Sequence, residues 1–186
     1  MKLLFKMILV LGITAFASGF FLSFVYTKTL QEIEHNRKRE IEVSIKELVP
    51  EGKRYKFSQL GGYKVYRVYN DKDEIVGYCI LASGSGYQGE IKILIAIAPD
   101  LEKLLGIKIV ENVETPGLGG KITSDWFVEQ FKNLKFMPKI EYVKNKKPVK
   151  KNQIQAITGA TISSSSVVRI INTAIKKVLP ALENEK

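Results

Sequence analysis

Six hydroxyl side chains are concentrated in nine residues near the end of the chain, from Thr158 to Ser166. Apolar residues at helical spacing follow directly, so the segment is predicted to begin a helix. One or two hydroxyls suffice to cap a first turn, and a plain cap is therefore one interpretation. The other is a phosphate site, because unpartnered N–H groups and the helix dipole favour an anion at a helix start. The residues alone leave both interpretations open.

A second segment, Glu114–Lys121, has the sequence ETPGLGGK. Its glycines lack a Cβ atom, so the backbone can approach a flat ligand closely and offer it unhindered N–H groups. Taken alone, the segment favours an ordinary surface loop. Together with the hydroxyl-rich segment it becomes a second candidate binding element.

Two glycine motifs resemble nucleotide-binding signatures but fail on their context. Gly84–Gly89 has the spacing G-x-G-x-x-G, yet the strongest strand pattern of the chain follows it, where the dinucleotide fingerprint requires a helix. We expect a tight connection between two strands there instead. Gly119–Ile122 fails the phosphate-loop pattern, because Ile122 stands where Ser or Thr must follow the lysine.

Composition excludes the commonest catalytic and metal-binding chemistries. The 186 residues include one cysteine, Cys79, and one histidine, His35. These numbers are too small for an internal disulfide, a multi-cysteine metal site or a histidine zinc site. His35 falls on the polar part of a charged segment predicted to be a helix, so we expect it to be solvated and not to serve in a Ser-His-Asp triad. With 45% hydrophobic and 26% charged residues, the chain has the composition of a folded domain.

The net charge of +10 is concentrated in two places. Residues 1–40 carry a net +3, and the lysine-rich segment 132–151 carries eight lysines and one glutamate, a net +7. The lysine-rich segment contains two prolines and two aromatic residues, which indicates strands and loops and argues against nucleic-acid binding. It is either a solvated loop or a docking surface for an acidic partner or anionic headgroups.

An uncharged run of 21 residues, Met7–Thr27, predicts a membrane anchor over residues 1–27. As a helix it would be about 31 Å long, which matches the hydrocarbon core of a bilayer. A cleaved signal peptide has a shorter apolar stretch, so we favour a retained anchor. Positive charges flank the run on both sides and leave its orientation open, because large domains are translocated largely regardless of charge.

The rest of the chain predicts an α+β domain of antiparallel strands with flanking helices. A charged helix over 28–48 leads from the anchor to this single domain, residues 49–186. Strand patterns cover 63–69, 74–81, 90–98 and 105–110. One helix begins at Thr123–Asp125 and is expected to bury Trp126, Phe127 and Phe131. The last helix is expected to run from Ser163 to Leu179 and to end at Pro180.

Three ordered segments resemble those of a known family. Thr158–Thr161 matches its [S/T]-G-A-T hallmark, Glu114–Gly119 its E-T-P-G-L-G segment and Gly86–Gly89 its G-Y-x-G segment. With its single anchor, the chain thus resembles the FMN-binding G subunit of Rnf complexes, the ion-translocating ferredoxin:NAD oxidoreductases. The C subunit of the sodium-translocating NADH:quinone reductase is a relative of that family. Gln155 departs from the pattern, which usually has an aspartate at this position.

The resemblance implies that residues 49–186 form an FMN-binding domain, with FMN attached covalently through a phosphoester to Thr161. The flavin ring would lie over the glycine-rich backbone, and the helix start would stabilise the phosphodiester. The other residues implied to bind the cofactor are Glu114, Thr115, Gly117, Leu118, Gly119, Thr158, Gly159, Ala160, Ser163 and Ser164. No catalytic or metal-ligating residue is expected, because the cofactor carries the redox chemistry.

The implied function is that of a flavoprotein subunit in a membrane-bound, ion-translocating electron transport complex, relaying electrons between ferredoxin and NAD branches. The implied partners are the other Rnf-type subunits, a flavin transferase for maturation and the lipid bilayer. The implied location is the cell (inner) membrane, with one span and the soluble domain on the extracytoplasmic side. The alternatives are the C subunit of a sodium-translocating quinone reductase and a cofactor-free, membrane-tethered binding module.

With the flavin site placed in this way, we expect none of the excess positive charge to lie in its surroundings. The charge would belong to the anchor flanks and to the lysine-rich segment. That segment is then expected to be a docking or headgroup-facing surface.

Overall fold

The computed structural model describes residues 2–184, apart from the Gln31 side chain, and divides the chain into two compact units, Met1–Glu40 and Ile41–Lys186. Helix α1 (Lys2–Leu48) supplies the first unit and the first residues of the second. Its most apolar stretch has a mean hydropathy of 2.2 and is unburied. Among the described residues it is the one helix long and apolar enough to cross a membrane, which makes it a candidate membrane span.

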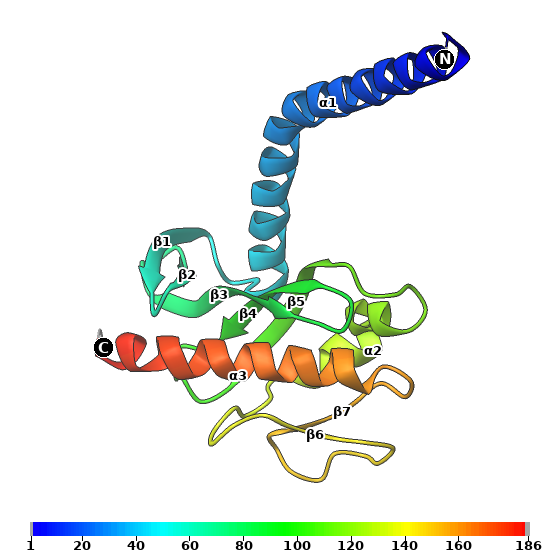
Figure 1. Ribbon diagram of the computed structural model, residues 1–186. Coiled ribbons are helices and arrows are strands. Elements are labelled where there is room, and N and C mark those ends of the chain that lie inside the picture. The colour runs from blue at the N-terminus through cyan, green and yellow to red at the C-terminus, as the bar shows by residue number, and fades with distance from the viewer. Residues whose placement is uncertain (1, 185–186) are drawn as a thin grey trace. The chain divides into compact units, whose positions relative to one another are not determined.

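The second unit is built on a five-stranded antiparallel sheet with its strands in sequence order (Figure 1). The strands are β1 (Arg54–Leu60), β2 (Tyr63–Tyr69), β3 (Ile75–Ser85), β4 (Glu90–Ile97) and β5 (Leu104–Asn112). The four predicted strands are confirmed as β2 to β5, and β1 was missed. Strand β1 lies at the edge of the sheet and is mostly exposed, so its sequence RYKFSQL carries no core pattern.

Both faces of the sheet are covered, which explains why β4 is almost continuously apolar. Along β4, Ile93, Ile95 and Ile97 belong to the main core, and Leu94 and Ala96 belong to a second cluster on the other face. The main core includes the apolar stripe of helix α3, which lies across the sheet in Figure 1. The second cluster is completed from the end of α1 and the residue after it, by Ile41, Ile45 and Val49.

Helix α3 (Thr161–Glu183) is longer than predicted, and Pro180 lies inside it rather than at its end. A proline lacks the N–H that would bond back to the previous turn, which is why a stop was expected there. Packing overrides that preference, because Leu182 beyond the proline is fully buried in the main core.

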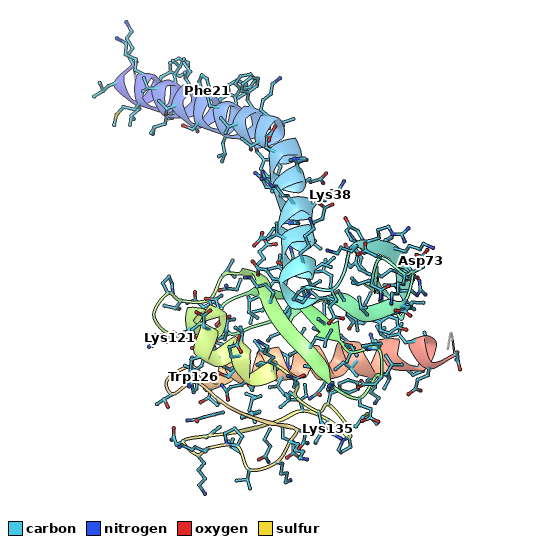
Figure 2. The ribbon with its side chains drawn as sticks, turned by 180° about the vertical axis from the view of Figure 1, so that it is seen from behind. Phe21, Lys38, Asp73, Lys121, Trp126 and Lys135 are labelled. Carbon is cyan, nitrogen blue, oxygen red and sulfur yellow. The ribbon has the colours of Figure 1, made fainter. Side chains whose placement is uncertain are left out.

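The predicted helix after Ser124 is only one turn, α2 (Asp125–Val128), and continues as a 3-10 turn, Glu129–Phe131. Phe127 and Phe131 are fully buried, with ring centroids 5.4 Å apart. Trp126 was expected on the same apolar side but is 54% exposed (Figure 2). Phe127 and Phe131 are four positions apart and so share one face of a helical turn. Trp126, the residue before Phe127, lies on a different face.

The lysine-rich segment contains one short strand, β6 (Glu141–Val143), and is otherwise mostly loop, in line with the predicted strands and loops. Strands β6 and β7 (Gln153–Gln155) pair in parallel as a small second sheet. The nine residues 144–152 connect them, and β7 leads directly toward the start of α3 (Figure 1).

Candidate functional site

A cavity of about 430 Å³ opens at the start of α3. This volume lies within the range of small-molecule and cofactor sites, roughly 300–1,000 Å³. Eight of the eleven predicted site residues line it: Glu114, Thr115, Leu118, Gly119, Gly159, Ala160, Thr161 and Ser163. The structure therefore brings together two segments that lie about forty residues apart in the sequence.

Strand register brings the segments together. Ser85 pairs with Glu90 at the turn between β3 and β4, and Ile91 pairs with Asn112 at the end of β5. The turn and the segment after β5 therefore leave the sheet at the same end. Helix α3 is fixed there by Arg169, whose guanidinium donates to the Ser85 carbonyl oxygen at 2.6 Å.

Glu114 connects the three motifs through its carboxylate. Its Oε1 accepts hydrogen bonds from the backbone N–H groups of Tyr87, at 2.7 Å, and Gln88, at 3.0 Å. Its Oε2 accepts one from the Ser163 hydroxyl at 2.5 Å. The residue is 5% exposed. Glu114 thus joins the β3–β4 turn to the first turn of α3 and acts as an internal clamp.

Two glycines leave room for this clamp. A Cβ atom on Gly119 would lie 2.6 Å from the Ser163 hydroxyl oxygen and would also overlap the Glu114 carboxylate. A Cβ atom on Gly86 would overlap the same carboxylate and lie 2.7 Å from Ile91 Cδ1. Both positions therefore require glycine because of close packing around Glu114.

The pKa of Glu114 lies below its ordinary value. Burial of the carboxyl raises the pKa, but the hydrogen bonds from Ser163 and from the amides of residues 87–89 lower it by more. The carboxylate is therefore negatively charged at neutral pH.

Thr161 differs from the other hydroxyl residues of its segment. Thr158 donates to Asn145 Oδ1 at 3.3 Å, and Ser163 donates to Glu114. The three following serines also form hydrogen bonds: Ser164 with Ala160 and Ile157, Ser165 with Ile162, and Ser166 with Arg169. Within residues 2–184, the Thr161 hydroxyl alone among these six has no hydrogen-bond partner. It also lines the cavity, so a molecule bound there could contact it.

The first turn of α3 also leaves backbone donors available. The first amides of a helix have no intrahelical acceptor, and here they belong to Thr161, Ile162 and Ser163. No side chain caps them, and all three residues line the cavity. The preceding Gly159 has a φ of +82°, a left-handed conformation that favours glycine in the turn entering the helix.

Three predicted site residues do not line the cavity. Gly117 lies in the loop outside it, and the Thr158 hydroxyl faces Asn145. Ser164 is fully buried, and its hydroxyl donates to the Ala160 carbonyl at 2.9 Å and accepts from the Ile157 N–H at 3.0 Å. These bonds tie the first turn of the helix to the segment before it and leave the first-turn amides uncapped.

Two lining residues were missed by sequence reasoning, Tyr87 and Ile162. They are 66% and 55% exposed, and Leu118 beside them is 55% exposed. Tyr87 stands inside the G-Y-x-G segment, which was the available signal for it. Nothing in the sequence indicated Ile162, because an exposed apolar residue at a helix start resembles any other.

Charge in the cavity wall is sparse. Among the described residues, no lysine, arginine or histidine lines it, and Glu114 is its one charged residue. The described residues contain no cluster of three or more His, Cys, Asp or Glu side chains that could hold a metal ion. An anion in this cavity would therefore be held by backbone N–H groups and hydroxyls.

Comparison with known proteins concerns the sequence of these segments and the fold. The profile of the FMN-binding domain matches residues 86–176, which include the β3–β4 turn, the glycine-rich segment and most of α3. The G subunit of the proton-translocating ferredoxin:NAD(+) oxidoreductase complex of Clostridium ljungdahlii is 33% identical over 168 residues, covering 90% of this chain and 88% of that protein. The G subunit of the ion-translocating oxidoreductase complex of Methanosarcina acetivorans is 28% identical and covers 93% of each chain.

Two solved structures share the fold. The C subunit of the Na(+)-translocating NADH-quinone reductase from Parabacteroides distasonis superposes with a TM-score of 0.60 at 22% identity, covering 70% of this chain and 78% of that one. Shewanella oneidensis NqrC superposes with a TM-score of 0.59 at 21% identity, covering 66% of this chain and 61% of that one. At these identities the likeness concerns the fold alone, and it confirms the α+β class.

Proposed function

Because the chain belongs to the family of G subunits of ion-translocating oxidoreductase complexes, we propose that it is a membrane-anchored component of such a complex and carries FMN in the cavity at the start of α3. When bound, FMN supplies the electron-transfer chemistry. The residues of the chain hold and orient it between the other redox subunits. The chain needs no acid, base or metal ligand of its own for this relay between ferredoxin and NAD.

The residues around the cavity fit FMN at both ends of the molecule. Tyr87, Leu118 and Ile162 offer exposed apolar surface to the flavin ring. The free N–H groups at the start of α3 suit the phosphate.

We propose further that FMN is esterified to Thr161, and the observation that carries this assignment is the unpartnered hydroxyl. A flavin transferase would bring flavin adenine dinucleotide to this oxygen. The Thr161 oxygen forms a new bond to the flavin-side phosphorus, the phosphoanhydride bond breaks, and AMP leaves. The hydroxyl proton passes to a base on the transferase.

Electrostatics also favour the ester. A phosphate monoester carries close to two negative charges at neutral pH, about −1.5 to −2, whereas a phosphodiester carries one. With the Glu114 carboxylate in its wall and no cation lining it within residues 2–184, the cavity accommodates the lower charge more readily. Esterification at Thr161 therefore reduces the repulsion inside the site.

The test is flavin retention after denaturation. The full chain, produced with and without a flavin transferase, is run on a denaturing gel under ultraviolet light and weighed intact. We expect a fluorescent band and a mass increase of one FMN less one water, only in the presence of the transferase. A dark band with unmodified mass in both samples would instead support a cofactor-free binding module.

We propose that the soluble unit lies on the extracytoplasmic side of the membrane, as the family resemblance implies. The native thiol is not expected to react with a maleimide, because Cys79 is fully buried and burial raises its pKa to about 12. A cysteine introduced at the exposed Asp71 is therefore expected to react with a membrane-impermeant maleimide in intact cells. Labelling that requires cell lysis would place the unit in the cytoplasm.

A further inference from the structure

The nine residues that connect β6 and β7, 144–152, form a basic loop beside the predicted attachment site. Val143 pairs with Gln155, and the Ala156 N–H donates to the Val143 carbonyl at 2.9 Å. Further along, the Thr158 hydroxyl donates to Asn145 Oδ1 at 3.3 Å. The first part of the basic loop therefore lies against the segment that leads into Thr161.

This placement overturns the expectation that the excess charge lies away from the flavin site. The contact with Thr158 is made by Asn145, and its neighbours in sequence are lysines: Lys144, Lys146 and Lys147. The expectation was based on the separation of the two segments in the sequence. Parallel pairing of β6 with β7 brings the loop back beside the segment that follows β7.

The charge of the basic loop is not neutralised within the described part of the chain. Its five lysines are all exposed, and it contains no acidic residue. Lys150 forms an ion pair with Glu141 at 3.3 Å. Within residues 2–184, the other four have no ion pair: Lys144, Lys146, Lys147 and Lys151.

The cavity does not use this charge either, since none of the lysines lines it. The positive charge is therefore presented to solvent beside Thr158, and its range is the Debye length, about 8 Å at physiological ionic strength. Thr158, which the loop contacts, precedes Thr161 by three residues. The loop therefore lies against the same short segment that carries the Thr161 hydroxyl.

We propose that the basic loop is a docking surface for an acidic face of the protein that delivers the flavin to Thr161. This inference rests on the proposed covalent attachment. Complementary charges at the rim of a site raise the rate of encounter and orient the partner, with less effect on the chemical step. Anionic lipid headgroups are also negatively charged, but a loop that served only to bind them would not need to lie beside the attachment segment.

The experiment uses the full chain in nanodiscs of neutral lipid, with purified transferase and flavin adenine dinucleotide. The initial rate of flavin attachment is read from in-gel fluorescence at limiting transferase. In the test variant, Lys144, Lys146 and Lys147 are replaced together by Gln. We expect its rate to fall about tenfold at an ionic strength of about 0.01 M. At about 1 M, where the Debye length is about 3 Å, the difference from wild type should disappear.

A matched variant replaces Lys53, Lys64 and Lys72 by Gln, three exposed lysines on the side of β1 and β2. It removes the same charge and should slow attachment less than about twofold, since these lysines lie away from the basic loop. Test and control variants should both reach the wild-type flavin content given time. Wild type that acquires no flavin would refute the proposed function itself.

Two outcomes would overturn the docking surface while leaving covalent attachment intact. One is a test variant that is flavinylated as fast as the matched control at low ionic strength. The other is a test variant that acquires flavin more slowly than wild type only when the nanodiscs contain anionic lipid. That result would assign the basic loop to the membrane surface.

Discussion

Replacing Thr161 by alanine is expected to yield a folded chain that retains no flavin after denaturation. The hydroxyl lies in the cavity wall and has no partner within residues 2–184, so its removal breaks no hydrogen bond. Alanine is a good helix former, and α3 should keep its first turn. The fluorescent band and the added mass should both be lost completely, while the far-UV circular dichroism stays that of wild type.

Neighbouring hydroxyls supply the controls. Thr158→Ala and Ser165→Ala remove hydroxyls that are already hydrogen-bonded, to Asn145 and to the Ile162 carbonyl. Both variants should still become fluorescent. Persistent fluorescence in Thr161→Ala, with loss in one of these controls, would move the attachment to the other residue.

Glu114→Ala is expected to lower the free energy of unfolding by about 3 kcal/mol, because it leaves three donors without their acceptor. These are the amides of Tyr87 and Gln88 and the hydroxyl of Ser163. The change is measured by denaturant unfolding of the full chain in detergent, followed by circular dichroism. Amide exchange should also accelerate in the β3–β4 turn, whose two N–H groups lose the carboxylate.

Glu111→Ala provides the comparison. Glu111 lies three residues earlier and forms an ion pair with Lys92 at 2.7 Å, with its side chain 43% exposed. Ion pairs of this exposure contribute roughly 0–1 kcal/mol, so the loss should be small. Equal destabilisation in the two variants would show that Glu114 is not a clamp.

The Glu114 clamp should also depend on pH. Its pKa is lowered in the folded state, so its contribution is fully present above the unfolded value of about 4.3. It is lost as the pH falls through the lower folded value. The stability difference between wild type and Glu114→Gln should therefore be constant near neutral pH and shrink in acid. A difference that grows on acidification would contradict the lowered pKa.

Much of the sheet was predictable because its strands carry their burial pattern in the sequence. Strand β4 is apolar on both faces and buried on both, so its sequence pattern indicated a buried strand. Strand β1 has Tyr55 and Phe57 among charged residues, and both rings are exposed. An edge strand whose side chains are mostly exposed has no such pattern to detect.

The sequence predicted which segments come together at the candidate site, but not the contacts within it. Glycines and hydroxyls indicated two segments, and eight of the eleven predicted residues line one cavity. The clamp by Glu114 could not be predicted, because it depends on the register that brings Tyr87 beside the end of β5. The position of Asn145 against Thr158 depends in the same way on a parallel pairing between two three-residue strands.

The second core cluster has a consequence for cutting the protein. The compact unit begins at Ile41, eight residues before the predicted domain boundary at residue 49. A soluble fragment that started at 49 would lack Ile41 and Ile45 and would expose Leu94 and Cys79 to water. An apolar face uncovered in this way favours aggregation. A fragment that begins before Ile41 keeps this cover, so the useful cut lies within α1 rather than at its end.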